Sequence, residues 1–485
     1  MIVLNQENQG ILDLFNLENT DVMSLECENV NDTMNITVVL NPDYLPCPDC
    51  GHDKPEILQY VKKKIRHSIL EDRACFLIYK ARRYRCPVCG RTYYEFNPFV
   101  FKNQKISAKT VFNILEELKE DTATFTSVAR HFHVSPTTAA HIFDAHVSIS
   151  RKQLPEFINI DECYAFSSDD SKYVCMLLDN ITQTPIDILP SRRLKDLESY
   201  FMSIPKEERM KVRMVCSDMY DGYRAAVKKC LPSAVTACDH FHLSKELNKQ
   251  VDSVRIRVMK RAKARKDTDT YYLLKKFNWM IYKSEETEAQ LKKKQRQLKR
   301  KMERGEKYNE DEALPLFDVN RKKKYNNHFK QYLNYYDIRE KIWAADKELK
   351  EAWKLKDECV DFYNLADKHT APALLDELIK KFRSSQIKEM QGFAKTLNRW
   401  REEIINSFTV VDIIYEVDPE NGVLSVREKK MNNALIENRN KILKVLKNNA
   451  NGYRNWTRFR NRAMYVLDKD ATYLLNPIEV EKKKK

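Results

Sequence analysis

Two aspartates in the sequence have the type and spacing expected of metal ligands. Asp161 ends the apolar stretch 157–161 and Asp218 ends the stretch 212–218, and both stretches are typical of buried strands. Carboxylates at adjacent strand ends repel each other, so they are stable together only when a cation lies between them. The net charge of +15 favours a polyanionic partner. These features indicate metal-assisted chemistry on nucleic acid.

Two-metal phosphoryl transfer usually needs a further acidic ligand. In such sites two cations lie about 3.5–4 Å apart, one activating the attacking oxygen and one stabilising the leaving oxygen. The candidate glutamates later in the chain are Glu402, Glu403, Glu416 and Glu437. Spacing alone does not choose among them.

Four of the twelve cysteines form two CxxCG repeats: Cys47, Cys50, Cys86 and Cys89. Each repeat predicts a tight knuckle that aims two thiolates at one point, and two knuckles give the tetrahedral sulfur coordination that suits a structural Zn²⁺. The long segment between the repeats predicts a bridging β-hairpin. The alternative is four unrelated core cysteines. Cys75, which lies between the repeats, is predicted to be a core residue.

Residues 126–143 have the pattern of a helix-turn-helix. Ala129 is small where two helices must cross closely, Ser135 is a suitable cap for the second helix, and Pro136 suits its first position. In such a motif the second helix enters the major groove of DNA. The residues that it would expose are Thr137, Thr138 and His141. The alternative is an ordinary helical hairpin.

From residue 157 to 250 the pattern predicts three antiparallel strands, a helix, a strand, a helix and a final strand. This order is that of a ribonuclease-H-like fold, in which the first and fourth strands are neighbours. Asp161 and Asp218 would then meet at one edge of the sheet. Glu162 is predicted to point to the opposite face of the sheet, and Asp221 to cap a helix.

The rest of the chain is predicted to be mostly helical. The lysine-rich stretch 291–301 is read either as a solvated helix face or as a contact with the DNA backbone, and the aromatic residues of this region either as core or as base-stacking residues. A loop is predicted at 306–316, a β-hairpin with an Asn421-Gly422 turn at 409–428, and a helix at 432–447. A short helix at 10–17 and a disordered tail at 482–485 complete the prediction.

The C-terminal region resembles bacterial insertion-sequence transposases of the ISL-three type. In that family a glutamate begins a helix of the form E-x-x-N-x-x-I-K, followed by G-[YF]-R-N and F-x-x-R; residues 436–447 and 451–460 are similar to this pattern. The order of the other motifs also fits: the cysteine pairs, the helix-turn-helix, I-x-x-D-E at 158–162, S-D-x-Y-x-x-Y at 217–223 and D-x-F-H-L at 239–243. The hairpin at 409–428 is read as an insertion.

The resemblance implies a DDE transposase with Asp161, Asp218 and Glu437 as catalytic residues. These three would hold two Mg²⁺ or Mn²⁺ ions per active site. Asp239 and His242 match an element that lies beside the active site in related transposases and handles a DNA strand. Arg454 and Arg458 are read equally as phosphate contacts or as helix surface. The implied reaction nicks the DNA at the terminal inverted repeats, and the freed 3′-hydroxyl then attacks target DNA.

The expected fold class is multidomain α+β, with a ribonuclease-H-like core interrupted by a long helical insertion. The expected domains are a zinc-binding DNA-binding domain (1–100), a helix-turn-helix domain (101–150), the first part of the catalytic core (151–250), a helical insertion ending in a β-hairpin (251–430) and the second part of the core with a basic tail (431–485). The expected partners are double-stranded DNA, as terminal repeats and target, and a second copy of the chain, because two DNA ends must be paired.

We expect a cytoplasmic, nucleoid-associated bacterial protein, since the sequence has neither an 18-residue apolar run nor a signal peptide. Two other functions remain open. One is a catalytically silent, domesticated DNA-binding regulator, and the other is a ribonuclease-H-like nuclease that does not join strands.

Overall fold

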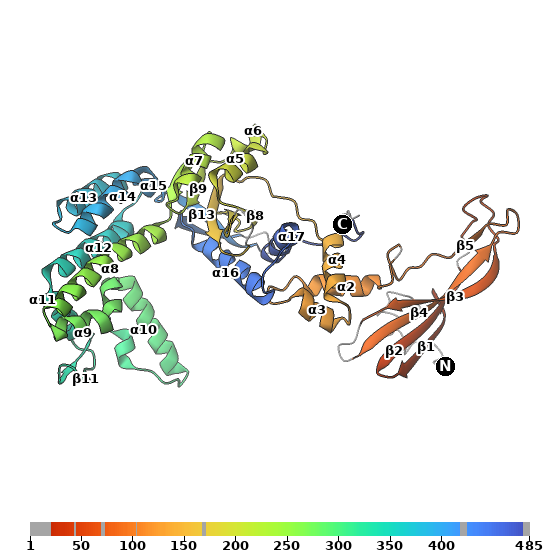
Figure 1. Ribbon diagram of the computed structural model, residues 1–485, viewed down its shortest axis with the longest axis horizontal. Helices are drawn as coiled ribbons and strands as arrows, with labels where there is room; N and C mark the ends of the chain where they lie inside the picture. The colour runs from red at the N-terminus through yellow and green to blue at the C-terminus, as the bar shows by residue number, and fades with distance from the viewer. Residues whose placement is uncertain are drawn as a thin grey trace.

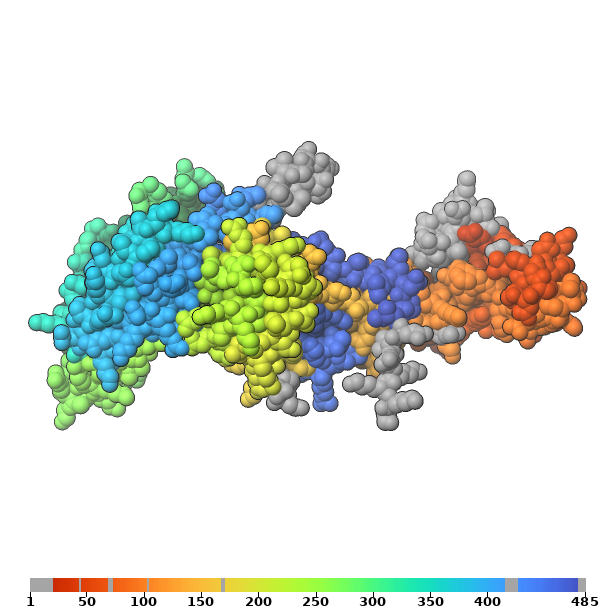
Figure 2. All heavy atoms as spheres, turned by 90° about the horizontal axis from the view of Figure 1, so that it is seen from above, coloured from red at the N-terminus to blue at the C-terminus, as the bar shows by residue number. Residues whose placement is uncertain are grey.

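The computed structural model describes residues 21–42, 45–68, 73–102, 104–166, 171–417 and 424–478. The molecule is elongated, with an N-terminal sheet at one end and a bundle of helices at the other (Figures 1 and 2). The predicted helix at 10–17, the Asn421-Gly422 turn and the tail at 482–485 lie outside the described residues. The mixed α+β, multidomain architecture predicted from the sequence is confirmed.

The N-terminal sheet carries both cysteine pairs at one end. Its strands are β1 (Val22–Val30), β2 (Thr33–Leu40), β3 (Glu56–Arg66), β4 (Ala74–Arg85) and β5 (Thr92–Tyr94), in the order β1-β2-β4-β3 with β5 beside β4. β3 and β4 form the hairpin predicted between the cysteine pairs. One face of the sheet is apolar, and Cys75 is fully buried there, as predicted for a core residue.

Three short helices follow the sheet: α2 (Ala108–Glu117), α3 (Phe125–His131) and α4 (Pro136–His146). The hydroxyl of Ser135 accepts a hydrogen bond from the Thr138 backbone N–H, so Ser135 caps α4 and Pro136 is its first residue, as predicted. His133 takes a positive φ of 49° in the turn between α3 and α4. The Val134 N–H donates to the Ala129 carbonyl and closes this turn.

The central sheet contains β6 (Phe157–Cys163), β7 (Val174–Asp179), β8 (Pro185–Leu189), β9 (Met214–Ser217) and β10 (Val235–Cys238). Its order is β10-β9-β6-β7-β8. β7 is antiparallel to both of its neighbours, β6 and β8, whereas β9 runs parallel to both β6 and β10. The predicted first and fourth strands are therefore neighbours.

Helices cover both faces of this sheet. α5 (Leu194–Met202) and α7 (Asp221–Cys230) pack on one face, and the four-residue helix α6 (Lys206–Arg209) follows α5. α16 (Ala434–Asn449) and α17 (Trp456–Leu467) pack on the other face. The second layer thus comes from a part of the chain that begins nearly 200 residues after the last strand of the sheet.

A bundle of helices separates β10 from those late elements. It contains α8 (His240–Ala264), α9 (Thr268–Lys276), α10 (Glu288–Glu303), α11 (Tyr335–Ala345), α12 (Lys347–Leu365), α13 (Ala371–Ser384), α14 (Lys388–Arg399) and α15 (Arg401–Asn406). Trp343 and Phe362 are buried in its core, so these aromatic residues are core residues. A 3₁₀ turn at Glu310–Ala313 lies in the predicted loop.

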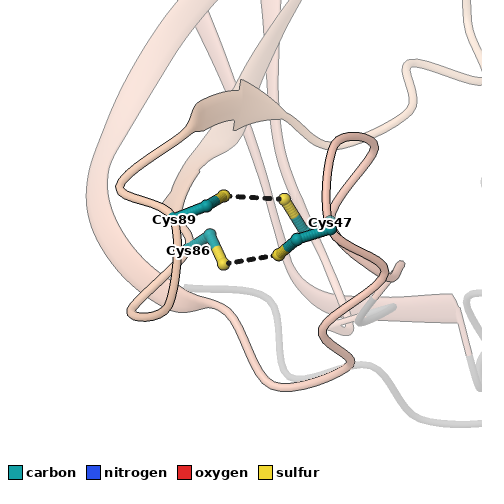
Figure 3. A group of neighbouring side chains, drawn as sticks. Cys47, Cys86 and Cys89 are labelled. Atoms are coloured by element: carbon teal, nitrogen blue, oxygen red, sulfur yellow. Dashed lines mark hydrogen bonds between the residues drawn. The ribbon is translucent and has the colours of Figure 1, made fainter.

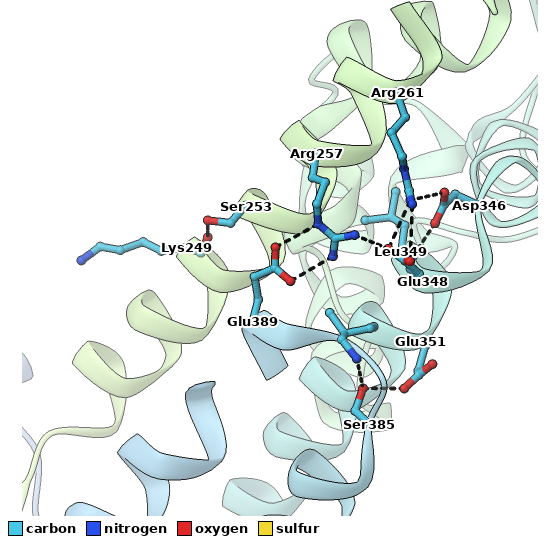
Figure 4. A network of polar contacts seen from close by, with 11 residues as sticks. Lys249, Ser253, Arg257, Arg261, Asp346, Glu348, Leu349, Glu351, Ser385 and Glu389 are labelled. Atoms are coloured by element: carbon cyan, nitrogen blue, oxygen red, sulfur yellow. Dashed lines mark hydrogen bonds and ion pairs between the residues drawn. The ribbon is translucent and has the colours of Figure 1, made fainter. Parts of the chain in front are cut away.

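Ion pairs join three helices of the bundle (Figure 4). Arg257 of α8 binds Glu389 of α14 through two nitrogens, at 3.1 and 2.9 Å, and it also pairs with Glu348 of α12 at 2.5 Å. Arg261, one turn further along α8, binds Glu348 and Asp346. A network of bidentate arginine contacts holds helix geometry better than isolated pairs do. The bundle is therefore a firm attachment for the elements that project from it.

The hairpin of β13 (Val410–Val417) and β14 (Leu424–Lys430) leads from α15 to α16. Val411 and Ile413 are buried against Met214 and Cys216 of β9. The Met431 N–H donates to the Thr409 carbonyl at the base of the hairpin. The base of the hairpin is thus part of the core, and it delivers the chain to the start of α16.

α17 also packs against the N-terminal helices. Arg458 binds Asp144 of α4 through two nitrogens, at 2.9 and 2.6 Å. The buried Arg462 donates to the carbonyls of Glu120 and Ala123, and Tyr465 lies in the apolar cluster of α2, α3 and α4. One helix therefore connects the central sheet to the helical unit. Among the described residues, none of the helices is long and apolar enough to cross a membrane.

Candidate functional site

Asp161 and Asp218 lie level with each other on neighbouring strands. Ile158 is the partner of Val215 and Asn159 is the partner of Cys216 in the parallel pairing of β6 with β9. Two residues beyond this last pair, the register leads to Asp161 in β6 and to Asp218, the residue that follows β9. This register agrees with the prediction that the two aspartates meet at one edge of the sheet.

The environment of both aspartates resists ionisation. Burial, together with the Glu162 carboxylate, raises the pKa of Asp161 to about 7, and the Asp218 carboxylate adds to this shift. Burial and Glu162 also raise the pKa of Asp218 to about 6. A group of buried, mutually repelling oxygen ligands is the environment in which a hard divalent cation is stabilising.

α16 reaches Asp161 directly through a buried amide. The Asn440 side-chain N–H donates to Oδ2 of Asp161 at 2.8 Å. Asn440 lies three residues after Glu437, so both side chains lie on the same side of the helix. Asn440 thereby fixes the orientation of Asp161 and sets the position of α16 relative to β6.

Glu437 lies beside Asp239 and His242. One ligand atom from each of these three residues falls within 4.8 Å of the others. Among the described residues, the other group of potential ligands this close together is the four cysteines. Asp161 and Asp218 are not members of the Glu437 group, although both interact electrostatically with His242. His242 is therefore near both the aspartate pair and the glutamate.

Asp239 favours the charged form of His242. His242 Nδ1 lies 3.0 Å from Oδ2 of Asp239, and this hydrogen bond raises the pKa of His242. Burial opposes ionisation of Asp239, but the contacts from His242, His240 and the Asn433 backbone lower its pKa overall. The pair starts at the N-terminus of α8, immediately after β10.

A network of buried asparagines attaches the start of α16 to β6. The Asn159 side-chain N–H donates to Oδ1 of Asn433 at 2.6 Å, and the Asn433 amide donates to the Ile160 carbonyl at 3.1 Å. The Asn433 backbone N–H donates to Oδ1 of Asp239. Asn180 donates to Asn159 and extends the network to β7. These contacts position Glu437 in spite of the hairpin that precedes it.

The sequence analysis did not identify Asn159, Asn433 or Asn440 as site residues. Asparagines do not follow an apolar period, so no pattern of periodicity marks them as buried. The available signal was the asparagine in the E-x-x-N motif, which falls on Asn440.

The other glutamates that spacing left open have different environments. Glu403 is buried and accepts a hydrogen bond from the Thr236 hydroxyl at 3.2 Å, and it lies 3.5 Å from Arg224. Glu402 is exposed on α15. The side chain of Glu416 lies outside the described residues. Glu403 is thus held by residues of β10 and α7, whereas Glu437 lies beside the potential metal ligands Asp239 and His242.

Two expectations about neighbouring acids have different outcomes. Glu162 points to the opposite face from Asp161, as predicted: it pairs with Arg192 at 2.5 Å, whereas Asp161 contacts α16. Asp221 does not cap a helix. It lies in the first turn of α7 and pairs with Arg224 at 2.8 Å and with Arg399, because its side chain is turned outward to these cations.

The donor set around Asp161 suits magnesium or manganese. Asp161, Asp218 and Glu437 would supply hard carboxylate oxygens, which these ions prefer, and burial and the Glu162 carboxylate raise the pKa of both aspartates. A divalent ion would supply compensating positive charge.

Metal affinity should depend on pH, because the metal and the protons compete for the same carboxylates. Deprotonation of Asp161 and Asp218 occurs near pH 7 and pH 6 in the metal-free protein. We therefore expect the affinity for Mn²⁺ to rise steeply between about pH 5.5 and 7.5, with proton release on binding. Calorimetric titrations in buffers of different ionisation enthalpy measure both quantities. A pH-independent affinity over this range would contradict the expectation.

The four cysteine sulfurs converge in the arrangement predicted from their spacing (Figure 3). Sγ of Cys47 lies 3.6 Å from Sγ of Cys89, and Sγ of Cys50 lies 3.5 Å from Sγ of Cys86. These separations are close to the value of about 3.8 Å that zinc–sulfur bonds of ~2.3 Å give in a tetrahedron. The cluster is compatible with structural zinc.

Glycine makes both knuckles possible. Gly51 and Gly90 follow the second cysteine of each pair with φ values of 71° and 74°, which side chains rarely adopt. Their N–H groups donate to the carbonyls of Cys47 and Cys86. The two turns are therefore equivalent, as expected when both pairs serve one metal ion.

Substitution of one cysteine in either knuckle should remove the metal. We expect Cys47→Ser and Cys86→Ser to lose one zinc ion per chain, because each leaves only three thiolates. Mass spectrometric metal analysis of the purified chain measures the stoichiometry. Cys27→Ser, in β1 of the same sheet, is the matched control and should keep the zinc. Unchanged zinc in both knuckle variants would exclude a four-cysteine site.

The residues expected to face DNA lie in three different settings. Thr137 and His141 are exposed on α4, and the half-buried Thr138 contacts the Ser135 hydroxyl. Arg454 is exposed at a groove of about 550 Å³ between the start of α3 and the loop after α16. Arg458 is held by Asp144, so part of its charge is neutralised within the protein.

Comparison with known families identifies the class of protein to which this fold belongs. A family model of DDE transposases of the ISL3 type, described as "Transposase", matches residues 158–413 and 418–463. The matched residues make up well over half of the chain, so the protein belongs to this transposase family. The match is interrupted only at 414–417, within β13, although the sequence pattern suggests that the whole hairpin is an insertion.

The chain is also similar to the transposase for insertion sequence element IS1001 of Bordetella parapertussis. The two are 20% identical over 261 residues, which cover 53% of this chain and 63% of that relative. The matched region therefore spans less than two thirds of the relative's length.

Proposed function

We propose that the protein is a metal-dependent DDE transposase that cuts DNA at the terminal inverted repeats of its insertion sequence and transfers the freed strand to target DNA. The main support is the level placement of Asp161 and Asp218 on adjacent parallel strands, with α16 attached to Asp161 through Asn440. The family match points to the same function. Asp161, Asp218 and Glu437 are the proposed catalytic residues.

We propose a ribonuclease-H-like core for the central sheet. Three antiparallel strands are followed by two parallel strands, with helices on both faces. In this interpretation residues 151–250 and 431–485 form one catalytic domain and residues 251–430 are inserted into it. The topology alone does not specify the reaction, so the reaction is assigned from the carboxylates.

Each residue near the site has a distinct proposed role. Asp161, Asp218 and Glu437 would hold the ions, which when bound supply Lewis acidity and charge stabilisation for in-line attack on a phosphodiester. Asn440 is a positioning residue for Asp161. Asp239 orients His242 and raises its pKa, which favours the protonated ring that would offer a positive charge to a DNA phosphate beside the carboxylates.

Two upstream units are the proposed DNA-recognition modules. α3 and α4, joined by a short turn, would form a helix-turn-helix, with Thr137, Thr138 and His141 on the helix that would enter the major groove. The four-cysteine sheet would form the second module, with residues 1–100 and 101–150 as separate domains. Arg454 would contact a phosphate at the groove beside α3. Arg458 would act mainly by keeping α4 in place through Asp144.

The decisive experiment uses the full chain, Mn²⁺ or Mg²⁺, and a duplex carrying the repeats that flank the gene. A transposase gives both cleavage at the repeat end and products in which that end is joined to a second duplex. Cleavage without joining would favour a nuclease, and binding without cleavage a silent regulator. No cleavage of repeat DNA under any divalent metal would contradict the proposal. Pairing of two DNA ends implies at least a dimer, which analytical ultracentrifugation of the complex measures.

A further inference from the structure

α10 is a helix that the hydrophobic core does not hold in place. None of its sixteen residues is buried, and Figure 1 shows it standing apart from the α8–α14 bundle. Short isolated helices are marginal in water, so other contacts must maintain it. Its N-terminus has a capping box between Thr287 and Gln290, and Lys294 and Lys301 pair with Glu286 and Glu312. These contacts attach one side of the helix and leave the other side free.

The free side of α10 is a continuous cationic stripe. Lys293, Arg296, Arg300 and Arg304 are spaced by three, four and four residues, which places them on one face of a helix, with Lys299 beside them. Within the described part of the chain, Lys293, Arg296, Lys299 and Arg300 make no ion pair. Like charges at these spacings destabilise an isolated helix by a few tenths of a kcal/mol per pair. A bound anion would remove this repulsion.

We propose that α10 is a DNA-binding arm whose cationic stripe contacts the phosphate backbone of the duplex on which the enzyme acts. From Lys293 to Arg304 the stripe spans twelve residues, a rise of about 16 Å at 1.5 Å per residue. B-DNA carries one negative charge per about 1.7 Å of its axis, so a helix of this length meets several phosphates at once. The ion-pair network between α8, α12 and α14 holds together the bundle from which the arm projects. The proposal rests on the proposed DNA substrate.

Charge argues for DNA rather than a second copy of the chain as the occupant. In a two-fold symmetric contact the stripe would meet the same stripe, and the chain as a whole carries a net charge of +15. The exposed cations also lack the apolar residues that make a helix–helix interface. Phosphate contacts of this kind add affinity without reading base sequence. The arm would therefore hold DNA whatever its sequence.

The test measures the salt dependence of binding to a random-sequence duplex of about 40 base pairs, without divalent metal. The full-length variant Lys293→Gln/Arg296→Gln/Lys299→Gln/Arg300→Gln removes four charges, and glutamine preserves helix propensity. Each lost phosphate contact lowers the slope of log K against log salt by about 0.9, so we expect the slope to fall by about 3 to 4. The double variant Lys293→Gln/Arg300→Gln should lose about half as much.

The matched control neutralises Lys347, Lys350, Lys354 and Lys380, which are exposed elsewhere on the bundle. It removes the same net charge, and its slope should change by less than about 1. Equal slopes for the parent and both α10 variants would overturn the proposal, as would equal losses in the α10 and control variants. A change of oligomeric state with an unchanged slope would assign the arm to contacts between copies. Because this measurement involves no cleavage, its outcome is independent of the catalytic assignment.

Discussion

Asp161→Asn is expected to abolish DNA cleavage and, at the same time, to stabilise the metal-free protein. Loss of positioning groups around a metal typically costs about 10–100-fold in activity, so loss of a charged ligand should exceed 100-fold. Asp161 carries the hydrogen bond from Asn440, which an asparagine oxygen can still accept. The variant should therefore remain folded, and single-turnover cleavage of repeat DNA with Mn²⁺ measures the loss.

The expected gain in stability follows from the raised pKa of Asp161. Its pKa is about 7 in the folded state and near 3.8 when unfolded, so the carboxyl favours folding only while protonated. The stabilisation that the protonated Asp161 gives to the folded state is complete below about pH 3.8 and is lost as the pH rises through 7. At pH 8 the full cost applies, and removing the charge should raise the free energy of unfolding by at most about 4 kcal/mol.

Thermal unfolding without added divalent metal measures this difference. The gain of the variant should be largest above pH 7, shrink as the pH falls and vanish near pH 4. Asp412→Asn, at an exposed position in β13, is the control and should leave the unfolding temperature unchanged at each pH. An Asp161→Asn protein that is less stable than the parent at pH 8 would contradict the repulsive environment inferred for the carboxylates.

Glu437→Gln should also reduce cleavage more than 100-fold, whereas Glu403→Gln should leave it within about tenfold. Glu437 lies beside Asp239 and His242, so loss of its charge removes a metal ligand. Glu403 accepts its hydrogen bond from Thr236, and glutamine can replace it there. Both changes keep the size of the side chain. Comparing the two variants therefore tests the choice of the third acidic ligand.

The affinity for Mn²⁺ tests the same two variants, Glu437→Gln and Glu403→Gln, independently of cleavage. Calorimetric titration with Mn²⁺ should show weaker binding for Glu437→Gln and parental binding for Glu403→Gln. If the Glu403 variant loses cleavage and the Glu437 variant keeps it, the third ligand is wrongly assigned. Equal loss in both would indicate a general effect on the bundle and the sheet.

The sequence predicted the parts of the fold that depend on local pattern. The alternation of apolar residues gave the five strands of the central sheet in their order, and strand adjacency then placed Asp161 level with Asp218. The spacing of the two CxxCG repeats predicted the converging sulfurs. In both cases each short segment has a local geometry that its own residues determine. A single strand pairing, β6 with β9 or β3 with β4, then brings the two segments together.

Contacts between distant, polar parts of the chain could not be predicted in the same way. Asn433 and Asn440 reach β6 over about 270 residues, and a buried asparagine has the same sequence signal as an exposed one. The sequence did not predict that the base of the β13–β14 hairpin packs on β9. The apolar residues of its strands are equally typical of a hairpin that projects into solvent. Arg458 suggested DNA contact by its type, whereas its actual partner is Asp144.

The late position of α16 and α17 has a consequence for how the protein is made. The apolar face of β7 and β8 that these helices cover is synthesised about 250 residues before them. On the ribosome, this face stays uncovered until α16 and α17 are made, at roughly 5–20 residues per second. A nascent chain that has not reached α16 has neither Glu437 nor a closed core. Assembly of the proposed active site therefore waits for α16, whereas the proposed DNA-recognition modules are synthesised long before it.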